Sequence, residues 1–534
     1  MSGASGVSDP SGSHHGTTLA GGALLNTLAF LSSNLRAIFT FLIARLLGGP
    51  VLGTFGVAWA AADLASKFGT LGLDYNVMAF VARSEANGDR AGSRRVWHTA
   101  VTTAVRASVA VAIVGFAASW MAPSWLGVRP DLARATAVMM LGVPGIVLYR
   151  VCNGLSRGMK VMQHDVYSRG LTESLGTALA LLIAVALGAR DLAPVTAAIA
   201  GTAASGLVAF SLARRLYVGA PSGRHYGPAA NADAAAAGAA APAEAGLIRT
   251  SLPIALYDLL NIGIMRVDVI LLGLFVGRAP GVSLDTVGIY AACVEVAGGL
   301  RKLSQAFTPI LTPVLAEQLA AGHQREAESS YAYVARWMLA LLLPAVAVLA
   351  LAGGAILTVF GPGFERGAPW VAIAGTACAL NAFVGLGETI LMIQRPAWNV
   401  LNTAFAFATA VVLNLLLIPR FGAMGAALGM LAPYVVQALL RGYELTWLLG
   451  WRWPVAALVR PWIAALVALP LALVVRLWLL DGLGAQVAAG GVYLVAYAGA
   501  WWHLGLEPED QAIAGRFGIA ERVLRGRVRR DERA

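Results

Sequence analysis

Long apolar runs separated by short polar breaks follow one another from about residue 20 to residue 505. Most runs hold about 20 residues or more, which is the length that an α-helix needs to cross a bilayer. A membrane β-barrel would instead show segments of about ten residues that alternate with period two. The pattern therefore predicts an all-α polytopic membrane protein with 14 transmembrane helices. These spans cover residues 20–46, 53–81, 98–121, 132–156, 168–188, 193–217, 247–276, 285–318, 331–359, 368–393, 398–418, 423–449, 455–480 and 485–505.

Composition and charge agree with this interpretation and orient the chain. The sequence is 58% hydrophobic and 13% charged, and its net charge is +11. With the N-terminus in the cytoplasm, 23 basic residues fall in cytoplasmic segments and 7 on the opposite side. Lys and Arg accumulate in cytoplasmic loops. We therefore expect a multi-pass protein of the cell membrane with both termini cytoplasmic, and we expect no nucleic-acid partner.

One low-complexity segment divides the chain. Residues 219–246 are rich in Ala, Gly and Pro, which is typical of a linker without a packed core. We expect a flexible tail over residues 1–19, a six-helix lobe over 20–218 and a second six-helix lobe over 247–450. Helices 13 and 14 then occupy residues 451–506, and a basic cytoplasmic tail follows over 507–534.

The two lobes resemble copies of each other. Residues 24–46 align without a gap with a stretch 232 residues later, so that Arg36 falls on Asp268. Gly53 likewise falls on Gly288 at an offset of 235. Because each copy holds an even number of spans, the repeat is predicted to be parallel, with its axis along the membrane normal, as in some transporters.

Several segments in order resemble the multidrug/oligosaccharidyl-lipid/polysaccharide (MOP) exporter superfamily, and within it the Wzx-type polysaccharide flippases. They are ARLLGGPVLGTFG at 44–56, RVDVILLG at 266–273, VGIYAACVEVAGGLRKL at 287–303, RWMLALLLP at 336–344, VFGPGFERGAPW at 359–370 and LNLLLIPRFGAMGAALG at 413–429. The resemblance implies a transporter, not an enzyme. It would move a polyprenyl-pyrophosphate-linked oligosaccharide to the outer leaflet by rocking two lobes. Two extra spans also occur in lipid II flippases, where they hold the lipid tail.

This resemblance also implies the partners and the chemistry of the site. The partners would be the lipid-linked oligosaccharide, membrane lipid, and the glycan polymerase and glycosyltransferases of the same pathway. A pyrophosphate needs cationic or N–H donors in a partly dry site. Charges are rare within spans and mark functional positions. The candidate cavity residues are Arg36, Asp63, Lys67, Asp258, Arg266, Asp268, Glu295, Arg301 and Lys302.

Helical spacing orders some of these residues, because positions three, four or seven apart share a face. Asp63 and Lys67 are four apart, which favours a mutual pair. Asp258, Asn261 and Asp268 form one predicted stripe, with Arg266 directed away from Asp268. Arg301 and Lys302 either bind pyrophosphate or extend toward the interface.

Arg36 and Asp268 are predicted either to face each other between the lobes or to pair locally within their own lobes. Arg150 and Glu173 lie in neighbouring spans, where a local pair and a proton-linked role are both open. A coupling ion, proton or sodium, would use carboxylates such as Asp258, Asp268 or Glu388.

Two prolines are candidate hinges. Pro309 and Pro313 in the eighth span are either hinges or static kinks, because proline removes a helical hydrogen bond. The sequence holds no P-loop, no metal-ligand cluster and no nucleophile triad. We therefore expect no cofactor and no metal.

Two alternative functions stay open. A cation-coupled exporter of small drugs would have the same fold but an acidic, aromatic cavity. A membrane-embedded glycan polymerase or ligase belongs to a different class and would need a large outer loop with catalytic polar residues. Every predicted outer loop here is short.

Overall fold

The computed structural model describes residues 37–218, 244–452, 455–479 and 482–504, and every element in these ranges is helical. The first half begins with a short helix, Ala37–Leu47. It continues with α2 (Gly49–Thr70), α3 (Leu73–Ala86), α4 (Arg90–Leu126), α5 (Pro130–Met140), α6 (Val143–Gly158), α7 (Gln163–Asp165), the π-helix η1 (Val166–Glu173), α8 (Ser174–Ala186) and α9 (Ala193–Val218).

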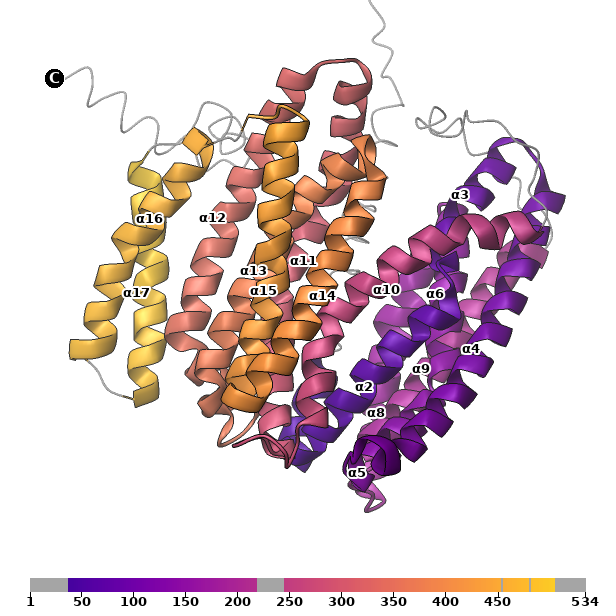
Figure 1. Cartoon of the computed structure of the whole chain (residues 1–534), viewed down its shortest axis with the longest axis horizontal. Helices are drawn as coiled ribbons and strands as arrows, with labels where there is room; N and C mark the ends of the chain where they lie inside the picture. Colours follow the sequence, from indigo (N-terminus) through magenta and orange to yellow (C-terminus); the bar gives the residue numbers. More distant parts are fainter. Residues whose placement is uncertain (1–36, 219–243, 453–454, 480–481, 505–534) are drawn as a thin grey trace, which may run out of the picture.

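The second half consists of longer helices. They are α10 (Glu244–Leu274), α11 (Leu284–Ala320), α12 (Gln324–Leu357), α13 (Ala368–Gln394), α14 (Pro396–Phe421) and α15 (Ala423–Tyr443). The short 3-10 turns η3 (Thr358–Phe360) and η4 (Phe364–Gly367) join α12 to α13, and the π-helix η5 (Glu444–Leu448) follows α15. Helices α16 (Val455–Val474) and α17 (Gly482–His503), joined by η6 (Val475–Leu479), pack against α12. They form the outer edge of the molecule in Figure 1.

Ten helices in the described residues are long and apolar enough to cross a membrane. This confirms the all-α polytopic membrane class. The predicted count of 14 also includes the first span, the second span (α2 and α3), α10 and α11. The described parts of these segments do not meet the same criteria of length, hydropathy and charge. In the structure, α2 packs against both α10 and α11. The spans that meet between the two halves therefore carry charged residues, such as Asp63, Lys67 and Arg266, where they face protein.

Two spans predicted as continuous helices are broken in the structure. The second span was expected to run unbroken over 53–81, but it is interrupted at Leu71 and Gly72, whose φ values are 51° and 74°. An added Cβ at Gly72 would lie 2.5 Å from the carbonyl oxygen of Ser251 on α10. Glycine therefore provides both the left-handed backbone and the room for α10 to approach. The fourth span is likewise divided between α5 and α6.

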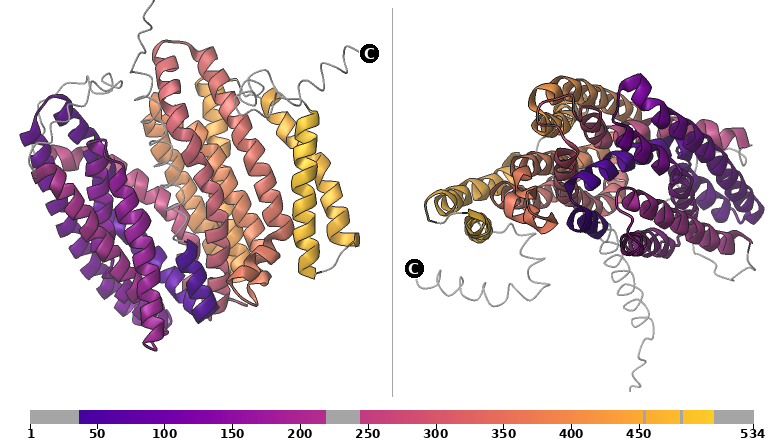
Figure 2. Two further views of the ribbon diagram at one scale, coloured as in Figure 1. Left: turned by 180° about the vertical axis from the view of Figure 1, so that it is seen from behind. Right: turned by 90° about the horizontal axis from the view of Figure 1, so that it is seen from below.

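The two halves converge at one end of the molecule and diverge at the other (Figure 1). We call the end where α9 stops and α10 starts the linker face, and the end where α2 and α11 start the far face. Helix α10 begins beside α3 at the linker face and then runs across to α14 of the second half. The turned views in Figure 2 show the same separation of the two bundles and the outlying position of α16 and α17.

Glycines allow α2 and α11 to approach each other closely at the far face. An added Cβ at Gly53 would lie 2.1 Å from the carbonyl oxygen of Leu284, and one at Gly288 would lie 2.0 Å from that of Gly49. Residues related by a two-fold axis meet each other only at that axis. Gly53 and Gly288 hold equivalent positions in the sequence repeat, and their close approach supports such an axis between α2 and α11.

Candidate functional site

Charged side chains from α2, α3, α6 and α10 meet between the two halves. We call Asp63, Lys67, Asp74, Arg150, Asp258 and Arg266 the junction cluster. Helix α2 contributes Asp63 and Lys67, whose side chains are only 4% and 9% exposed. The helix breaks after Thr70, and Asp74 in the first turn of α3 pairs with Lys67 across this break. A carboxylate is also favourable at a helix start because of the helix dipole.

Asp63 lies between two arginines from different halves. Its Oδ1 is 2.5 Å from Nη2 of Arg150 on α6, and its Oδ2 is 2.7 Å from Nη2 of Arg266 on α10. Nε of Arg266 also donates to Oδ2 at 2.9 Å. Nη1 of Arg150 donates to the Ser66 hydroxyl at 2.8 Å. One buried carboxylate therefore ties α2 to a helix of its own half and to the crossing helix.

Lys67 makes the second link between the halves. Its ammonium group is 3.1 Å from Oδ2 of Asp74 and also pairs with Asp258 of α10. It lies 5.7 Å from the ring centroid of Tyr75, within the range of a cation–π contact. Asn76 extends this contact on the linker side by donating to the hydroxyls of Thr250 and Ser251 at 3.0 and 2.8 Å. The start of α10 is thus held to α3 by polar contacts.

Burial makes these pairs sensitive to the loss of a partner. Breaking a buried ion pair is strongly destabilising because it leaves a charge without compensation, whereas an intact pair adds little net stability. The cluster therefore favours a particular arrangement of α2, α3 and α10 more than it raises overall stability. Any movement of α10 relative to α2 must separate or exchange these partners.

The expected pair between Asp63 and Lys67 is wrong. Each residue instead reaches partners on other helices, because the break at Leu71 and Gly72 presents Asp74 to Lys67. The sequence pattern indicated a continuous helix here and did not show this turn. The Arg150–Glu173 pair is also not formed, since Arg150 binds Asp63. Arg150 and Asp74 are the members of the cluster that sequence reasoning did not select as cavity residues.

The expected stripe on α10 is wrong as well. Asp258 and Arg266 both reach α2, whereas Asp268 turns to α11 and accepts a hydrogen bond from the Tyr290 hydroxyl at 2.6 Å. A helix turns by about 100° per residue, so residues three or seven apart are only roughly aligned. Over the ten positions from Asp258 to Asp268, the side-chain directions therefore differ by about 80°. Arg266 lies about 80° from Asp258 in the opposite direction around the helix. It therefore points away from Asp268, as predicted.

A second polar group ties α10 to the second half. Glu388 on α13 accepts a hydrogen bond from the Tyr257 hydroxyl, and its Oε2 is 2.9 Å from Nη2 of Arg441 on α15. Nη1 of Arg441 donates to the Val384 carbonyl at 3.3 Å. Arg441 is not among the residues predicted from the sequence.

The other predicted residues lie apart from the junction cluster. Arg301, Lys302 and Glu295 are half-buried on α11. In the described part of the chain no carboxylate lies within 4 Å of Arg301. Pro309 and Pro313 lie within α11, which continues to Ala320, so their role as hinges stays a prediction. Arg36 lies outside the described residues.

Comparison with known proteins gives a family and a fold. Residues 18–319 match the model of a family described as "Polysaccharide biosynthesis protein". The structure is similar to lipid II flippase MurJ in an inward closed conformation, with a TM-score of 0.65 and 12% identity over 90% of this chain and 99% of that one. No curated protein matches.

Similar folds also occur among MATE family multidrug resistance transporters of the MOP superfamily. An inward-facing structure has a TM-score of 0.59 and 14% identity over 77% of this chain and 92% of that one. An outward-facing structure has a TM-score of 0.53 and 15% identity over 78% of this chain and 92% of that one. At these identities the likeness concerns the fold alone.

Proposed function

Because the chain belongs to the polysaccharide biosynthesis protein family and has the fold of MOP superfamily transporters, we propose that it flips a lipid-linked oligosaccharide. The cargo would be a polyprenyl-pyrophosphate-linked sugar, moved from the inner to the outer leaflet of the cell membrane. The family and the fold assign the chain to transporters and not to enzymes. The membership therefore confirms the resemblance found in the sequence.

The observation that carries the proposal is the position of the junction cluster. Arginine binds phosphate oxygens in the same bidentate way as carboxylate oxygens. Arg150 and Arg266 are already paired with a carboxylate at the place where the two halves meet. A pyrophosphate that reaches Arg266 can replace Asp63 as its partner, and this exchange weakens the tie between α2 and α10.

This exchange suggests how binding is coupled to movement. Tight glycine packing joins α2 and α11 at the far face. The ion pairs of the junction cluster hold the crossing helix α10 to α2 and α3 toward the linker face. We propose that the linker face is cytoplasmic, that both termini lie there, and that the substrate enters from that side. The 14-span count and the parallel arrangement of the two lobes belong to the same proposal.

The lipid tail needs an apolar surface beside the halves. Helices α16 and α17 pack on α12 and expose many large apolar side chains, such as Trp462, Trp478 and Val495. The side-chain Oε1 of Gln486 accepts the amide N–H of Ala355 at 2.9 Å and so fixes α17 to α12. We propose that this pair of helices accompanies the lipid tail.

The decisive experiment measures in which leaflet the lipid-linked sugar lies. After depletion of the protein, the lipid-linked oligosaccharide should accumulate in the cytoplasmic leaflet, where a membrane-impermeant glycan probe added to intact cells does not reach it. Re-expression of the wild-type chain should restore labelling from outside. An unchanged distribution between the leaflets would contradict the proposal.

The same cells test the small-molecule alternative. Efflux of a fluorescent lipophilic cation should not change on depletion if the cargo is a lipid-linked sugar. A loss of efflux with normal sugar distribution would favour the cation-coupled exporter instead.

A further inference from the structure

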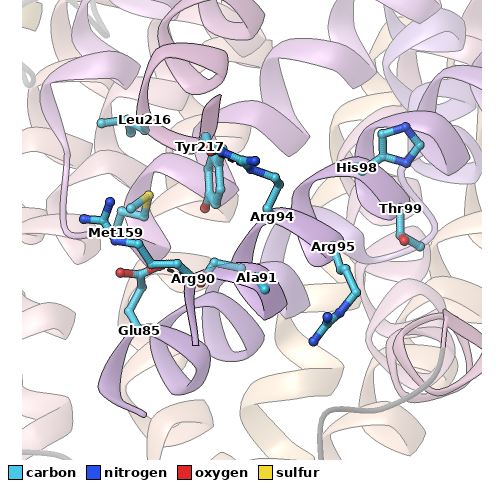
Figure 3. Close-up of a pocket in the computed structure, with 11 residues that line it drawn as sticks. Glu85, Arg90, Ala91, Arg94, Arg95, His98, Thr99, Met159, Leu216 and Tyr217 are labelled. Atoms are coloured by element: carbon cyan, nitrogen blue, oxygen red, sulfur yellow. Dashed lines mark hydrogen bonds between the residues drawn. The ribbon is translucent and has the colours of Figure 1, made fainter. Parts of the chain in front are cut away.

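A cavity of about 640 Å³ lies at the linker face of the first half, away from the junction cluster. It is bounded by the end of α3, the first turns of α4, the segment after α6 and the end of α9. Figure 3 shows Arg90, Arg94 and Arg95 of α4 around it, with Glu85, Met159 and Tyr217 on the other walls. The proposed transport step makes no use of this cavity.

Tyr217 lines the cavity and is packed behind by two further aromatic rings. The ring of Trp97 stacks on Phe210 and Tyr217, with centroids 6.0 and 6.2 Å apart. The Tyr217 hydroxyl donates to the carbonyl of Leu155 at 2.9 Å, which fixes α9 to α6. Nε of Arg94 donates to the carbonyl of Tyr217 at 3.1 Å. The guanidinium of Arg94 is therefore held beside Tyr217 at the edge of the cavity.

The charges around the cavity are unbalanced. Among the described residues that line it, the only acidic one is Glu85, which accepts a hydrogen bond from the buried Ser93 hydroxyl at 2.6 Å. Asp89 caps the amide of Gly92 at 2.7 Å and pairs with Arg95 at 3.5 Å. In the described part of the chain no carboxylate lies within 4 Å of Arg90 or Arg94. Two guanidinium groups are thus free to bind an anion, and phosphate suits their fork of donors.

Beyond the cavity, α4 continues with a row of exposed apolar side chains. Below His98, α4 exposes Val105, Val109 and Ile113 by 39%, 43% and 65%, at the spacing of one helical face. Arg106 lies on the same exposed side. A ligand that fits both features carries a phosphate at one end and an acyl chain at the other.

We propose that this arginine cavity binds the phosphate headgroup of an anionic glycerophospholipid, with one acyl chain along the exposed apolar face of α4. Arg90 and Arg94 supply the charge-assisted hydrogen bonds, and Tyr217 and Leu216 of α9 bound the headgroup on the opposite side. The bound lipid would join α3, α4 and α9 at the membrane boundary.

The test is lipid binding to the full-length protein in detergent, measured by native mass spectrometry with phosphatidylglycerol as the probe. Hydrogen bonds in which the donor or acceptor is charged are the strong ones. We therefore expect R90Q/R94Q to weaken phosphatidylglycerol binding by at least about tenfold. R134Q, which removes an exposed arginine of α5 without a carboxylate partner, is the matched control and should change binding less than about twofold.

A second variant adds a charge and removes none. Ala91 lines the cavity and is exposed, so A91E places a carboxylate beside the expected phosphate. An acidic residue in the first turn favours the helix, so folding should be preserved while phosphatidylglycerol binding falls about tenfold.

Two further probes identify the source of the phosphate. Phosphatidylcholine should bind more weakly than phosphatidylglycerol, and inorganic phosphate at the lipid concentration should not compete. Wild-type affinity in both R90Q/R94Q and A91E, equal binding of phosphatidylcholine, or full competition by inorganic phosphate would each overturn the proposal. Because the readout is binding, its outcome is independent of whether the chain flips a lipid-linked sugar.

Discussion

At the scale of single residues, the decisive feature is that one buried carboxylate serves two arginines. Asp63 contacts Arg150 from its own half and Arg266 from the crossing helix. Neither arginine has another carboxylate within 4 Å in the described ranges. The position of α10 against α2 therefore depends strongly on this single side chain.

We expect D63N to lower the stability of the protein by up to about 3–5 kcal/mol, because it leaves two partly buried arginines, 18% and 25% exposed, without a counter-charge. The measurement is the thermal unfolding midpoint of the purified protein in detergent. D131N is the control, since Asp131 forms an exposed pair with Arg129 at 2.7 Å, and such pairs contribute about 0–1 kcal/mol. Equal midpoints for D63N and D131N would contradict the role given to Asp63.

The structure also shows the contacts of Asp268. The sequence left open whether it faces Arg36 across the halves or pairs locally. Its contact with Tyr290 at 2.6 Å, together with the amide of Val269 at 2.8 Å, favours a local role. Arg36 itself is outside the described part of the chain, so its own partner stays a prediction.

A charge reversal separates these two alternatives. We expect R36D and D268R each to abolish flipping, and we expect the double variant R36D/D268R not to recover it. We also expect Y290F to lower the unfolding midpoint, because it removes a buried hydrogen bond to a carboxylate worth about 1.5–3 kcal/mol. Recovery of flipping in the double variant would instead support a pair that spans the two halves.

At the scale of elements, polar and small residues decide where helices approach each other. Glycines allow α2 and α11 to touch through their backbones at the far face. The break between α2 and α3 lets the backbone at Gly72 approach α10 closely and places Asp74 beside Lys67. Apolar periodicity predicted the spans themselves but neither of these contacts, because both depend on a neighbour far along the chain.

Replacement of one of these glycines tests the far-face contact. In G288A the new Cβ would lie 2.0 Å from the carbonyl oxygen of Gly49, so the two helices must separate. Overpacking of this kind costs about 1–3 kcal/mol, and we expect a lower unfolding midpoint and reduced flipping. Gly299 lies on the same helix with no atom within 4 Å of an added Cβ. G299A should therefore be neutral or slightly stabilising, and the same loss in both variants would argue against a specific contact.

At the scale of the whole molecule, two halves meet through spans that carry charged residues. Helices α2, α10 and α11 form the boundary, and the apolar spans surround it (Figure 2). If the halves rock during transport, the far ends of α2 and α11 must separate at some stage. A covalent link there should then stop the cycle.

We expect an engineered disulfide in G49C/D285C to block flipping until a reductant is added. An added Cβ at Gly49 would lie 3.6 Å from Cα of Asp285, which is compatible with the Cα separation of a disulfide. The three native cysteines are buried, so oxidation should be confined to the new pair. Each single cysteine variant is a control, and normal flipping by the fully cross-linked protein would exclude a cycle that opens the far face.

The sequence alone determined the class of the protein, the order of most spans, the resemblance to its family and the polar positions within spans. These properties are local, because the length of an apolar run and the helical period do not depend on distant residues. The fourteen-span count, the lobe boundaries and the roles of the cavity residues stay predictions.

The tertiary structure alone decided which charges meet. Asp63 and Arg266 are 203 positions apart, and Lys67 and Asp258 are 191 apart. Whether such side chains pair depends on how two helices cross and on where each is broken. The predictions of the Asp63–Lys67 pair and of the α10 stripe were wrong for this reason. Spacing within one helix does not show which partners another helix supplies.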